Sequence, residues 1–396
     1  MNEQDESYRW VILVLAWVVG LVLAMPFFAY PPLLPEITLD LKMSTTETAL
    51  LMSLTTLAFT SFHLVGGISA DRFGTKKTMS LGLTILSAST LLSATANTSI
   101  LELTTRLMTG VGIGLTGVCI IKVLSNWFPK KELPLAVGLQ ATGWAAGNAT
   151  GLFFPVILEK PLGMGWRGPI YVFGLFGCVA TIVFIILAKD RAPSSSQSSI
   201  GKTLPTILRL REFWFLTVAQ LGFVASNTAI ITWLPTALID SGWTTEVAAL
   251  ATAVIALIGI PANLMGGVVS NRMGRRKPVL LLSGLALCLS TALLGFVLSG
   301  PLLWPVVCIL GWFTFFFTGP FFATPSALPE VGVEKVGTFV GLMMIFSSVG
   351  GFISPIMVGL LRDSTGSYLF GFLMSAGFAA PLALPGLLGR ETGIKT

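Results

Sequence analysis

The chain has 396 residues, of which 54% are hydrophobic and 11% are charged, and its mean hydropathy is +0.85. A soluble protein of this length needs a larger share of polar surface, so the composition excludes an ordinary soluble domain. The net charge of +6 is concentrated in short segments between long apolar ones, which fits a membrane protein better than a nucleic-acid-binding protein.

Eleven segments without a charged side chain predict how often the chain crosses a membrane. A helix that spans the hydrocarbon core needs about 20 apolar residues. Segment 278–329 is long enough for two helices, with Gly300-Pro301 as the break, and segment 107–121 spans if Arg106 or Lys122 lies in the membrane. The sequence therefore predicts an all-α polytopic membrane protein with twelve transmembrane helices. The segments are 10–35, 48–70, 78–101, 107–121, 133–158, 168–188, 213–239, 247–271, 278–329, 336–361 and 364–389.

The distribution of basic residues predicts the orientation. If the N-terminus is cytoplasmic, 18 of the 24 Lys and Arg residues fall in cytoplasmic segments, so both termini are expected in the cytoplasm, as in a plasma (bacterial inner) membrane protein. Segment 10–35 has an acidic flank and no small-residue cleavage site, and is expected to be a retained helix. The four cysteines have no metal or disulfide spacing, and we expect no cofactor, no metal and no nucleic acid.

The predicted second helix ends in a cluster of charges. The stretch GGISADRFGTKK, residues 66–77, holds four charges within seven residues. Gly67 and the glycine before it allow another helix to approach closely, and the carboxylate of Asp71 needs a partner such as the positive N-terminus of a helix. The stretch is either a cytoplasmic latch that stabilises one conformation or a simple basic loop. The turn that orients Asp71 is expected to use Arg72, Gly74, Lys76 and Lys77.

A second copy of this stretch, GGVVSNRMGRRK, occupies residues 266–277. Aligning 34–77 with 234–277 gives 13 identities in 44 positions, so each half of the chain begins with the same unit, six helices apart. Asn271 stands in place of Asp71 and supplies no charge, so the second latch is expected to be weaker. The candidate residues of this latch are Gly267, Asn271, Arg272 and Gly274.

Residues 189–212 are polar and rich in serine, which predicts a cytoplasmic linker between one bundle at 1–188 and another at 213–396. From Thr206 the linker is expected to be either a short basic helix on the membrane surface or a solvated segment. Parallel six-helix halves favour alternating access, in which two bundles rock around a site near the middle of the bilayer.

Ionisable residues inside apolar segments are candidates for a transport path. Arg106 has Glu102 one turn before it, and either binds a solute or pairs with Glu102. Lys122 is expected to extend toward the cytoplasm. His63 is the only histidine, and either carries a coupling proton or packs with a hydrogen bond. Because no carboxylate lies in the central part of a predicted helix, an anionic or neutral solute is favoured over an organic cation.

Uncharged polar and aromatic residues are further candidate contacts for a solute. Each has a packing role as its alternative, and Tyr30 is either a gate or an anchor at the membrane interface. The candidates are Tyr30 in the first predicted helix, Trp144 and Asn148 in the fifth, Asn227 and Trp233 in the seventh, and Trp312 in the tenth.

The stretch GGISADRFGTKK resembles the signature between helices 2 and 3 of the major facilitator superfamily, and RLMTGVGIG, residues 106–114, resembles its fourth-helix pattern. The resemblance extends to the organic and inorganic anion permeases of the superfamily and covers the twelve predicted helices, both basic loops and the linker. It implies that Asp71 meets the N-terminus of helix 11, near Val336-Gly337. Proton-coupled anion permeases of the superfamily often carry a carboxylate one or two turns beyond the arginine. Here those positions hold Gly110, Ile113 and Gly114, so exchange, uniport and a relay through His63 stay open.

These features favour a secondary transporter of a small anionic solute, working as a monomer in the lipid bilayer by rocker-switch alternating access. A proton-linked exporter of hydrophobic compounds is the alternative within transport. A membrane-embedded enzyme would need a convergent nucleophile, base or metal cluster, which a single histidine without mid-membrane carboxylates does not supply. A receptor that binds a solute without transporting it is a further alternative.

Overall fold

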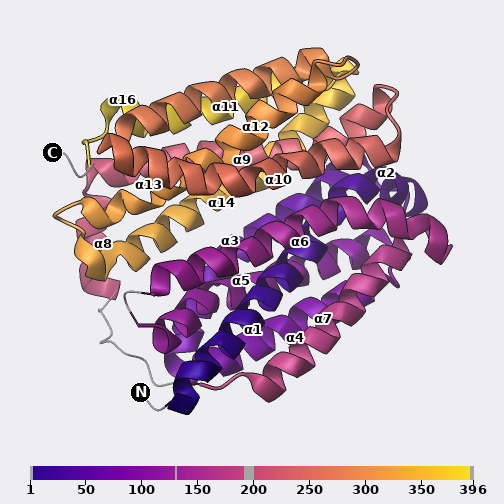
Figure 1. Cartoon of the computed structure of the whole chain (residues 1–396). Coiled ribbons are helices and arrows are strands. Elements are labelled where there is room, and N and C mark those ends of the chain that lie inside the picture. The colour runs from indigo at the N-terminus through magenta and orange to yellow at the C-terminus, as the bar shows by residue number, and fades with distance from the viewer. Residues whose placement is uncertain (1–2, 130–131, 191–199, 393–396) are drawn as a thin grey trace. The chain divides into compact units, whose positions relative to one another are not determined.

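The computed structural model describes residues 3–129, 132–190 and 200–392, and the regular elements in these ranges are helices. The chain divides into two compact units, unit 1 (Met1–Ser195) and unit 2 (Ser196–Thr396), and most of their helices are labelled in Figure 1. The boundary lies within the predicted linker, of which residues 191–199 fall outside the described ranges. Each unit is therefore described by itself.

Unit 1 is built from seven helices in its described residues. The first two form one apolar stretch that is interrupted at Ala29, so the described part of the unit has six helical segments. The interruption follows from Pro31 and Pro32, which have no N–H to continue the hydrogen-bond ladder of the preceding helix. The helices are α1 (Glu3–Phe28), α2 (Tyr30–Asp40), α3 (Thr45–Phe73), α4 (Thr75–Ser93), α5 (Ser99–Trp127), α6 (Leu133–Leu162) and α7 (Arg167–Leu187).

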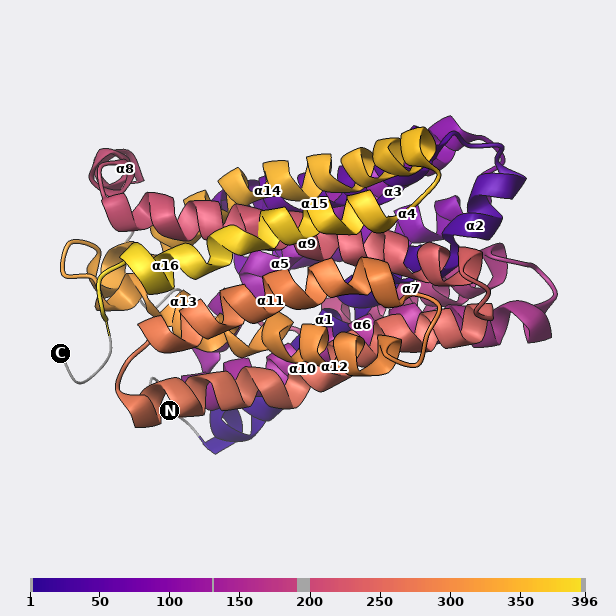
Figure 2. The same cartoon turned by 90° about the horizontal axis from the view of Figure 1, so that it is seen from above.

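Unit 2 repeats this plan after a short helix, α8 (Ile200–Leu208), which starts before Thr206 and ends before Arg209. Short helices complete two of its spans: α13 prolongs α12, and α16 continues in the direction of α15 (Figure 2). The other helices are α9 (Arg211–Asp240), α10 (Thr245–Met273), α11 (Lys277–Val297), α12 (Leu303–Phe316), α13 (Thr318–Ala323), α14 (Gly332–Thr365), α15 (Leu369–Ala379) and α16 (Leu384–Leu388), with 3-10 turns at Pro325–Ala327 and Ala380–Ala383.

Ten segments of the described residues are long and apolar enough to cross a membrane, and α4 and α6 complete six segments in each unit. The predicted break at Gly300-Pro301 falls between α11 and α12. Helix α5 includes both Arg106 and Lys122, which explains how the short uncharged segment reaches spanning length. The prediction of an all-α protein with two six-helix bundles is confirmed.

Glycines allow α3 and α5 to pack with their backbones in contact. A Cβ atom at Gly66 would lie 2.8 Å from the carbonyl oxygen of Leu115, and one at Gly114 would lie 2.6 Å from the carbonyl oxygen of Phe59. Apolar burial gives little driving force between helices in lipid, so their association depends on such close van der Waals contact. The closely packed helices α3 and α5 hold the polar groups of unit 1 in position.

We predict that Gly66→Ala destabilises the protein by about 1–3 kcal/mol relative to Gly67→Ala, because only the methyl at position 66 would overpack the α3–α5 contact. A Cβ at Gly67 meets no atom within 4 Å, and both sites are helical, so the adjacent glycine is a matched control. Unfolding midpoints of the purified variants in detergent test this. Equal midpoints for the two variants would contradict the packing argument.

Candidate functional site

Arg106 is the most deeply buried cation that the structure describes, with 1% of its surface exposed. Its Nε donates to the carbonyl oxygen of Leu51 at 3.2 Å, and its Nη1 donates to that of Pro26 at 3.0 Å. Pro26 lies in the last turn of α1, where carbonyls have no partner within the helix. The aromatic ring of Tyr30 covers the guanidinium, with 3.7 Å between its centroid and Cζ. Arg106 thus ties the α1–α2 break to α3 and α5.

The carboxylate of Glu102 is buried beside this arginine, with 0% of the residue exposed. The hydroxyl of Ser93, at the end of α4, donates to both carboxylate oxygens at 2.9 and 3.0 Å. Because the Ser93 proton is used there, the Tyr30 hydroxyl donates to Ser93 in a short hydrogen bond. Glu102 and Arg106 are therefore linked through Tyr30, which is 1% exposed and lies inside the unit rather than at its surface.

A second group in unit 1 contains His63 and Trp144. The ring of Phe59 on α3 lies 4.7 Å from that of His63 and stacks on that of Trp144 at 6.0 Å, with an interplanar angle of 19°. One turn further along α6, Asn148 is 4% exposed, and its Oδ1 accepts no hydrogen bond from the described residues. The sequence-predicted candidates of unit 1 thus form two sets, Tyr30 with Arg106 and Trp144 with His63 and Asn148.

The charged loop between α3 and α4 is organised by partners that the sequence did not indicate. Asp71 forms an ion pair with Lys122, which extends along α5 to the same end of the unit. Gly74 adopts φ +93°, which favours glycine. The turn there is fixed by Asp190, whose Oδ1 accepts hydrogen bonds from Thr75 Oγ1 at 2.7 Å and from the backbone N–H of Lys76 at 2.9 Å.

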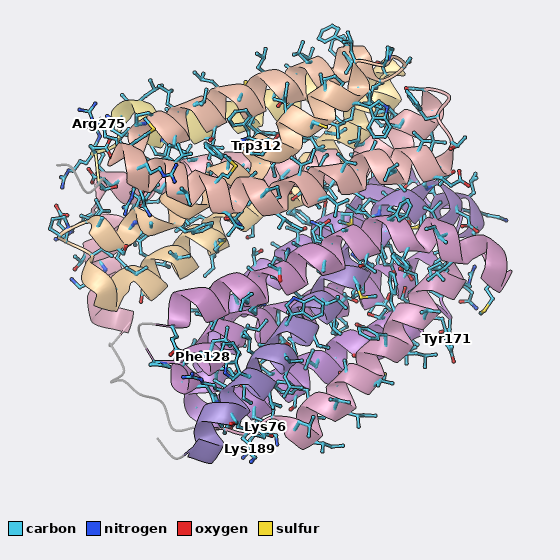
Figure 3. The ribbon with its side chains drawn as sticks, in the orientation of Figure 1. Lys76, Phe128, Tyr171, Lys189, Arg275 and Trp312 are labelled. Atoms are coloured by element: carbon cyan, nitrogen blue, oxygen red, sulfur yellow. The ribbon has the colours of Figure 1, made fainter. Side chains whose placement is uncertain are left out.

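The other charged residues predicted for the latch of unit 1 are Arg72, Lys76 and Lys77. Arg72 is exposed and lies against the ring of Phe73, 5.3 Å from its centroid. Lys77 is also exposed. Lys76 and Lys189 lie at the same end of the unit, and Tyr171 lies toward the other end (Figure 3). The interactions described in the structure therefore assign the turn to Asp190, and not to the basic side chains that were expected to hold it.

Unit 2 has an equivalent turn with a different carboxylate. Glu391 accepts hydrogen bonds from the backbone N–H groups of Arg276 at 2.8 Å and Lys277 at 3.4 Å, at the start of α11. Asp190 and Glu391 are 201 positions apart, close to the repeat of the two halves, and this spacing was the signal that could have identified both. Gly274 has a positive φ of 63°, as Gly74 does, whereas Asn271 and Arg272 are exposed.

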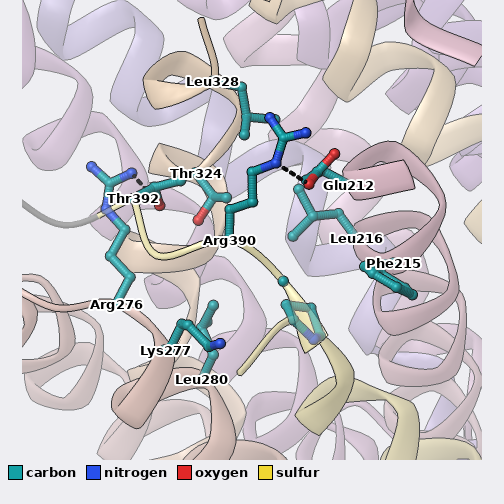
Figure 4. A pocket seen from close by; sticks show the side chains of 12 residues that line it. Glu212, Phe215, Leu216, Arg276, Lys277, Leu280, Thr324, Leu328, Arg390 and Thr392 are labelled. Carbon is teal, nitrogen blue, oxygen red and sulfur yellow. Dashed lines mark hydrogen bonds and ion pairs between the residues drawn. The ribbon is translucent and has the colours of Figure 1, made fainter. Parts of the chain in front are cut away.

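The same end of unit 2 holds a shallow pocket lined by Arg276, Lys277 and Arg390. Arg390 contacts Glu212 at 2.8 Å and Glu330 at 2.7 Å, and Arg276 donates to Thr392 Oγ1 at 3.2 Å (Figure 4). These basic groups are therefore already paired with acceptors of the unit.

The candidates of unit 2 do not form one cluster with each other. Trp233 is 3% exposed and donates from Nε1 to the carbonyl oxygen of Pro355 at 2.8 Å within the unit. Trp312 stacks on Phe316 with 6.1 Å between ring centroids. Asn227 lines a small pocket with Ser226 and Thr314. Gly267 resembles Gly67, since a Cβ at either position meets nothing within 4 Å.

The family model described as Major Facilitator Superfamily matches residues 16–355. The chain belongs to this superfamily. It is 26% identical over 366 residues to the hexuronate transporter of Bacillus subtilis (87% of this chain, 86% of that protein), and 25% identical over 402 residues to the probable sulfoacetate transporter SauU of Cupriavidus necator (93% and 92%). A solved bacterial homologue of the human lysosomal transporter Spinster has the same fold, with a TM-score of 0.81, 14% identity and 98% of each chain covered.

This superfamily membership makes the chain an integral membrane transporter of a small solute and not an enzyme. The predicted resemblance to the anion permeases of the superfamily is confirmed by relatives that are named as hexuronate and sulfoacetate transporters.

For this superfamily member, we predict that Asp190→Ala lowers the free energy of unfolding by about 1 kcal/mol, because the N-terminus of α4 loses its side-chain acceptor. Glu391→Ala should have a similar effect through the N-terminus of α11. Denaturant unfolding of the two variants and the wild type in detergent measures this. Unchanged stability in both variants would show that water replaces the carboxylates without cost.

Proposed function

We propose that this chain transports a small organic anion across the bacterial inner membrane, as a monomer with cytoplasmic termini, by rocker-switch alternating access. The observation that supports this most strongly is the buried guanidinium of Arg106. A cation in a low-dielectric interior costs several kcal/mol unless other groups compensate it. The position equivalent to Arg106 in the second half is Val306, so the repeat of the fold does not require a cation there.

The hydrogen-bond partners of Arg106 are uncharged, so its guanidinium can still bind an anion. Two carbonyl oxygens and an aromatic ring contact the guanidinium directly, and none of these three groups carries a charge. A carboxylate or sulfonate can replace the carbonyls with two parallel, charge-assisted hydrogen bonds from the guanidinium. Hexuronate and sulfoacetate, the solutes in the names of two relatives, both carry such groups.

Tyr30 is the proposed gate to this site. It covers the face of the guanidinium, so a solute reaches Arg106 only when the ring moves. Tyr30 is the first residue of α2, directly after the interruption at Ala29, where the backbone can bend most easily. A change in the angle between α1 and α2 would therefore expose the arginine.

Further contacts with the solute are proposed at the remaining candidates. Asn148 offers an unpaired Oδ1 next to Trp144, and His63 lies beside the same aromatic group and is the proton-coupling candidate of the sequence. From unit 2 the proposed contacts are Asn227, Trp233 and Trp312.

The loop after α3 is proposed to act as a latch on the cytoplasmic side. In this proposal Asp71 alternates between Lys122 and the N-terminus of α14, which starts at Gly332, slightly before the predicted position. Gly67 supports this, because a Cβ there would meet no atom of its own unit. The exposed Arg72 and Lys77 and the half-buried Lys76 face anionic lipid headgroups. The uncharged Asn271 makes the second copy the weaker latch.

We predict that Arg106→Gln lowers exchange of labelled glucuronate or sulfoacetate in proteoliposomes at least 10-fold, because the solute loses a charge-assisted bidentate contact. Arg106→Lys should retain part of the activity, since it keeps the charge without the planar fork. The control is Arg167→Gln, which removes an arginine that pairs with Asp40 at the end of the unit.

Two results would contradict this proposal. One is wild-type protein that moves an uncharged hydrophobic compound but no anion, which would favour the exporter. The other is wild-type exchange in Arg106→Gln, which would leave the arginine with a structural role only.

Replacement of Asp71 by asparagine tests the proposed latch. If Asp71 alternates between two partners, this variant should slow solute exchange at least 5-fold, whereas Lys122→Gln should slow it less, because only the first loses both contacts. Exchange rates in proteoliposomes at saturating solute provide the measurement. Equal, near wild-type rates would identify the stretch as a simple basic loop.

A further inference from the structure

We infer that Glu102 is the proton-binding group that couples proton movement to anion transport. This inference rests on the proposed anion site at Arg106 and names the coupling ion that the sequence left open. Glu102 is 0% exposed and lies one helical turn before Arg106 on α5. The sequence alone indicates only a counter-charge at this position, because Glu102 stands near the edge of an uncharged segment.

The surroundings of Glu102 connect it directly to the arginine. From α4, Ser93 donates to its carboxylate, and from α2, Tyr30 donates to Ser93 while its ring covers Arg106. From α1 and α3, the carbonyls of Pro26 and Leu51 accept from the guanidinium. The charged and titratable groups of this cluster are therefore one glutamate, one tyrosine and one arginine.

The balance of charge makes the binding of a proton and of an anion depend on each other. With Glu102 ionised, Glu102 and Arg106 sum to zero. An anion that enters this neutral cluster creates an uncompensated negative charge in a low-dielectric interior, which is costly. If a proton binds to a Glu102 carboxylate oxygen at the same time, the cluster and a monovalent anion again sum to zero. Each ligand then raises the affinity for the other by the same factor.

This linkage allows a transport cycle in which one proton and one monovalent anion cross the membrane together. A proton from water on one side bonds to Glu102, and the anion takes the place of the carboxylate as counter-charge to Arg106. After the conformational change, the anion leaves and the same proton returns to water on the other side. The Tyr30 and Ser93 hydroxyls can each donate and accept, so they provide a hydrogen-bonded route for that proton.

His63 is less suited to this task in the structure. Its ring lies 4.7 Å from that of Phe59, and its Nε2 lies 3.0 Å from where a Cβ on Gly117 would stand. Its described interactions include no link to Arg106. A histidine in this position has no direct means of sensing whether the arginine holds an anion.

The test compares two assays of the full-length protein in proteoliposomes with labelled glucuronate as the probe. Exchange without a pH gradient reports anion binding and movement, and accumulation driven by an imposed pH gradient reports coupling. We expect Glu102→Gln, which mimics the protonated group, to retain exchange within about 3-fold and to lose at least 90% of the driven accumulation. Glu47→Gln, at a capping glutamate near the start of α3, is the control and should accumulate the probe like the wild type, and His63→Gln tests the other candidate for the proton.

A second measurement does not depend on the fold of a variant. Addition of glucuronate to the purified wild-type protein in weakly buffered detergent should take up close to one proton per bound anion. Ser93→Ala should shift the pH of half-maximal uptake upward, because the ionised carboxylate loses a donor.

The outcomes separate this inference from the proposed function. If the wild type moves no anion in either assay, the anion site at Arg106 fails, and the coupling fails with it. If the wild type exchanges anions but takes up no proton, or if His63→Gln loses the uptake while Glu102→Gln keeps it, only the coupling through Glu102 is overturned.

Discussion

A guanidinium enclosed in a membrane bundle is the constraint on which the arrangement of unit 1 depends. Arg106 can be buried only where acceptors face it, and the ones it finds are backbone carbonyls of α1 and α3. The carbonyl of Pro26 is available because α1 ends at Phe28, and the last carbonyls of a helix have no partner within it. The interrupted first span and the arginine of the fourth span are thus joined by one hydrogen bond, from Arg106 to Pro26.

The close contact of α3 with α5 brings these parts within reach of one another. Gly66 and Gly114 remove the side chains that would hold the two backbones apart, and Thr55 on α3 donates to the carbonyl oxygen of Arg106 itself at 3.1 Å. Unit 2 has the glycine packing without the arginine. The two halves therefore share a scaffold, and the polar chemistry of the membrane interior is concentrated in the first half.

The turns between α3 and α4 and between α10 and α11 show what a local sequence pattern can predict and what it cannot. The repeat of residues 66–77 at 266–277 correctly predicted two equivalent turns, because glycines and basic residues at fixed spacing mark a turn next to the membrane. The pattern did not identify Asp190 and Glu391 as the groups that fix those turns. Each is more than 100 residues away along the chain, and a single unaligned sequence holds no local signal for such a contact.

The sequence by itself determined the membrane class, the number of spans, the two-fold repeat and the candidate arginine. The membrane class, the spans and the arginine follow from the cost of charge and of unsatisfied backbone groups in lipid. The repeat follows from the identities between residues 34–77 and 234–277. Only the tertiary structure decided that Tyr30 covers Arg106, that Ser93 meets Glu102 and that Trp233 is occupied by a backbone carbonyl. Those facts depend on how helices distant in sequence pack together, and hydrophobic pattern alone does not specify which faces meet.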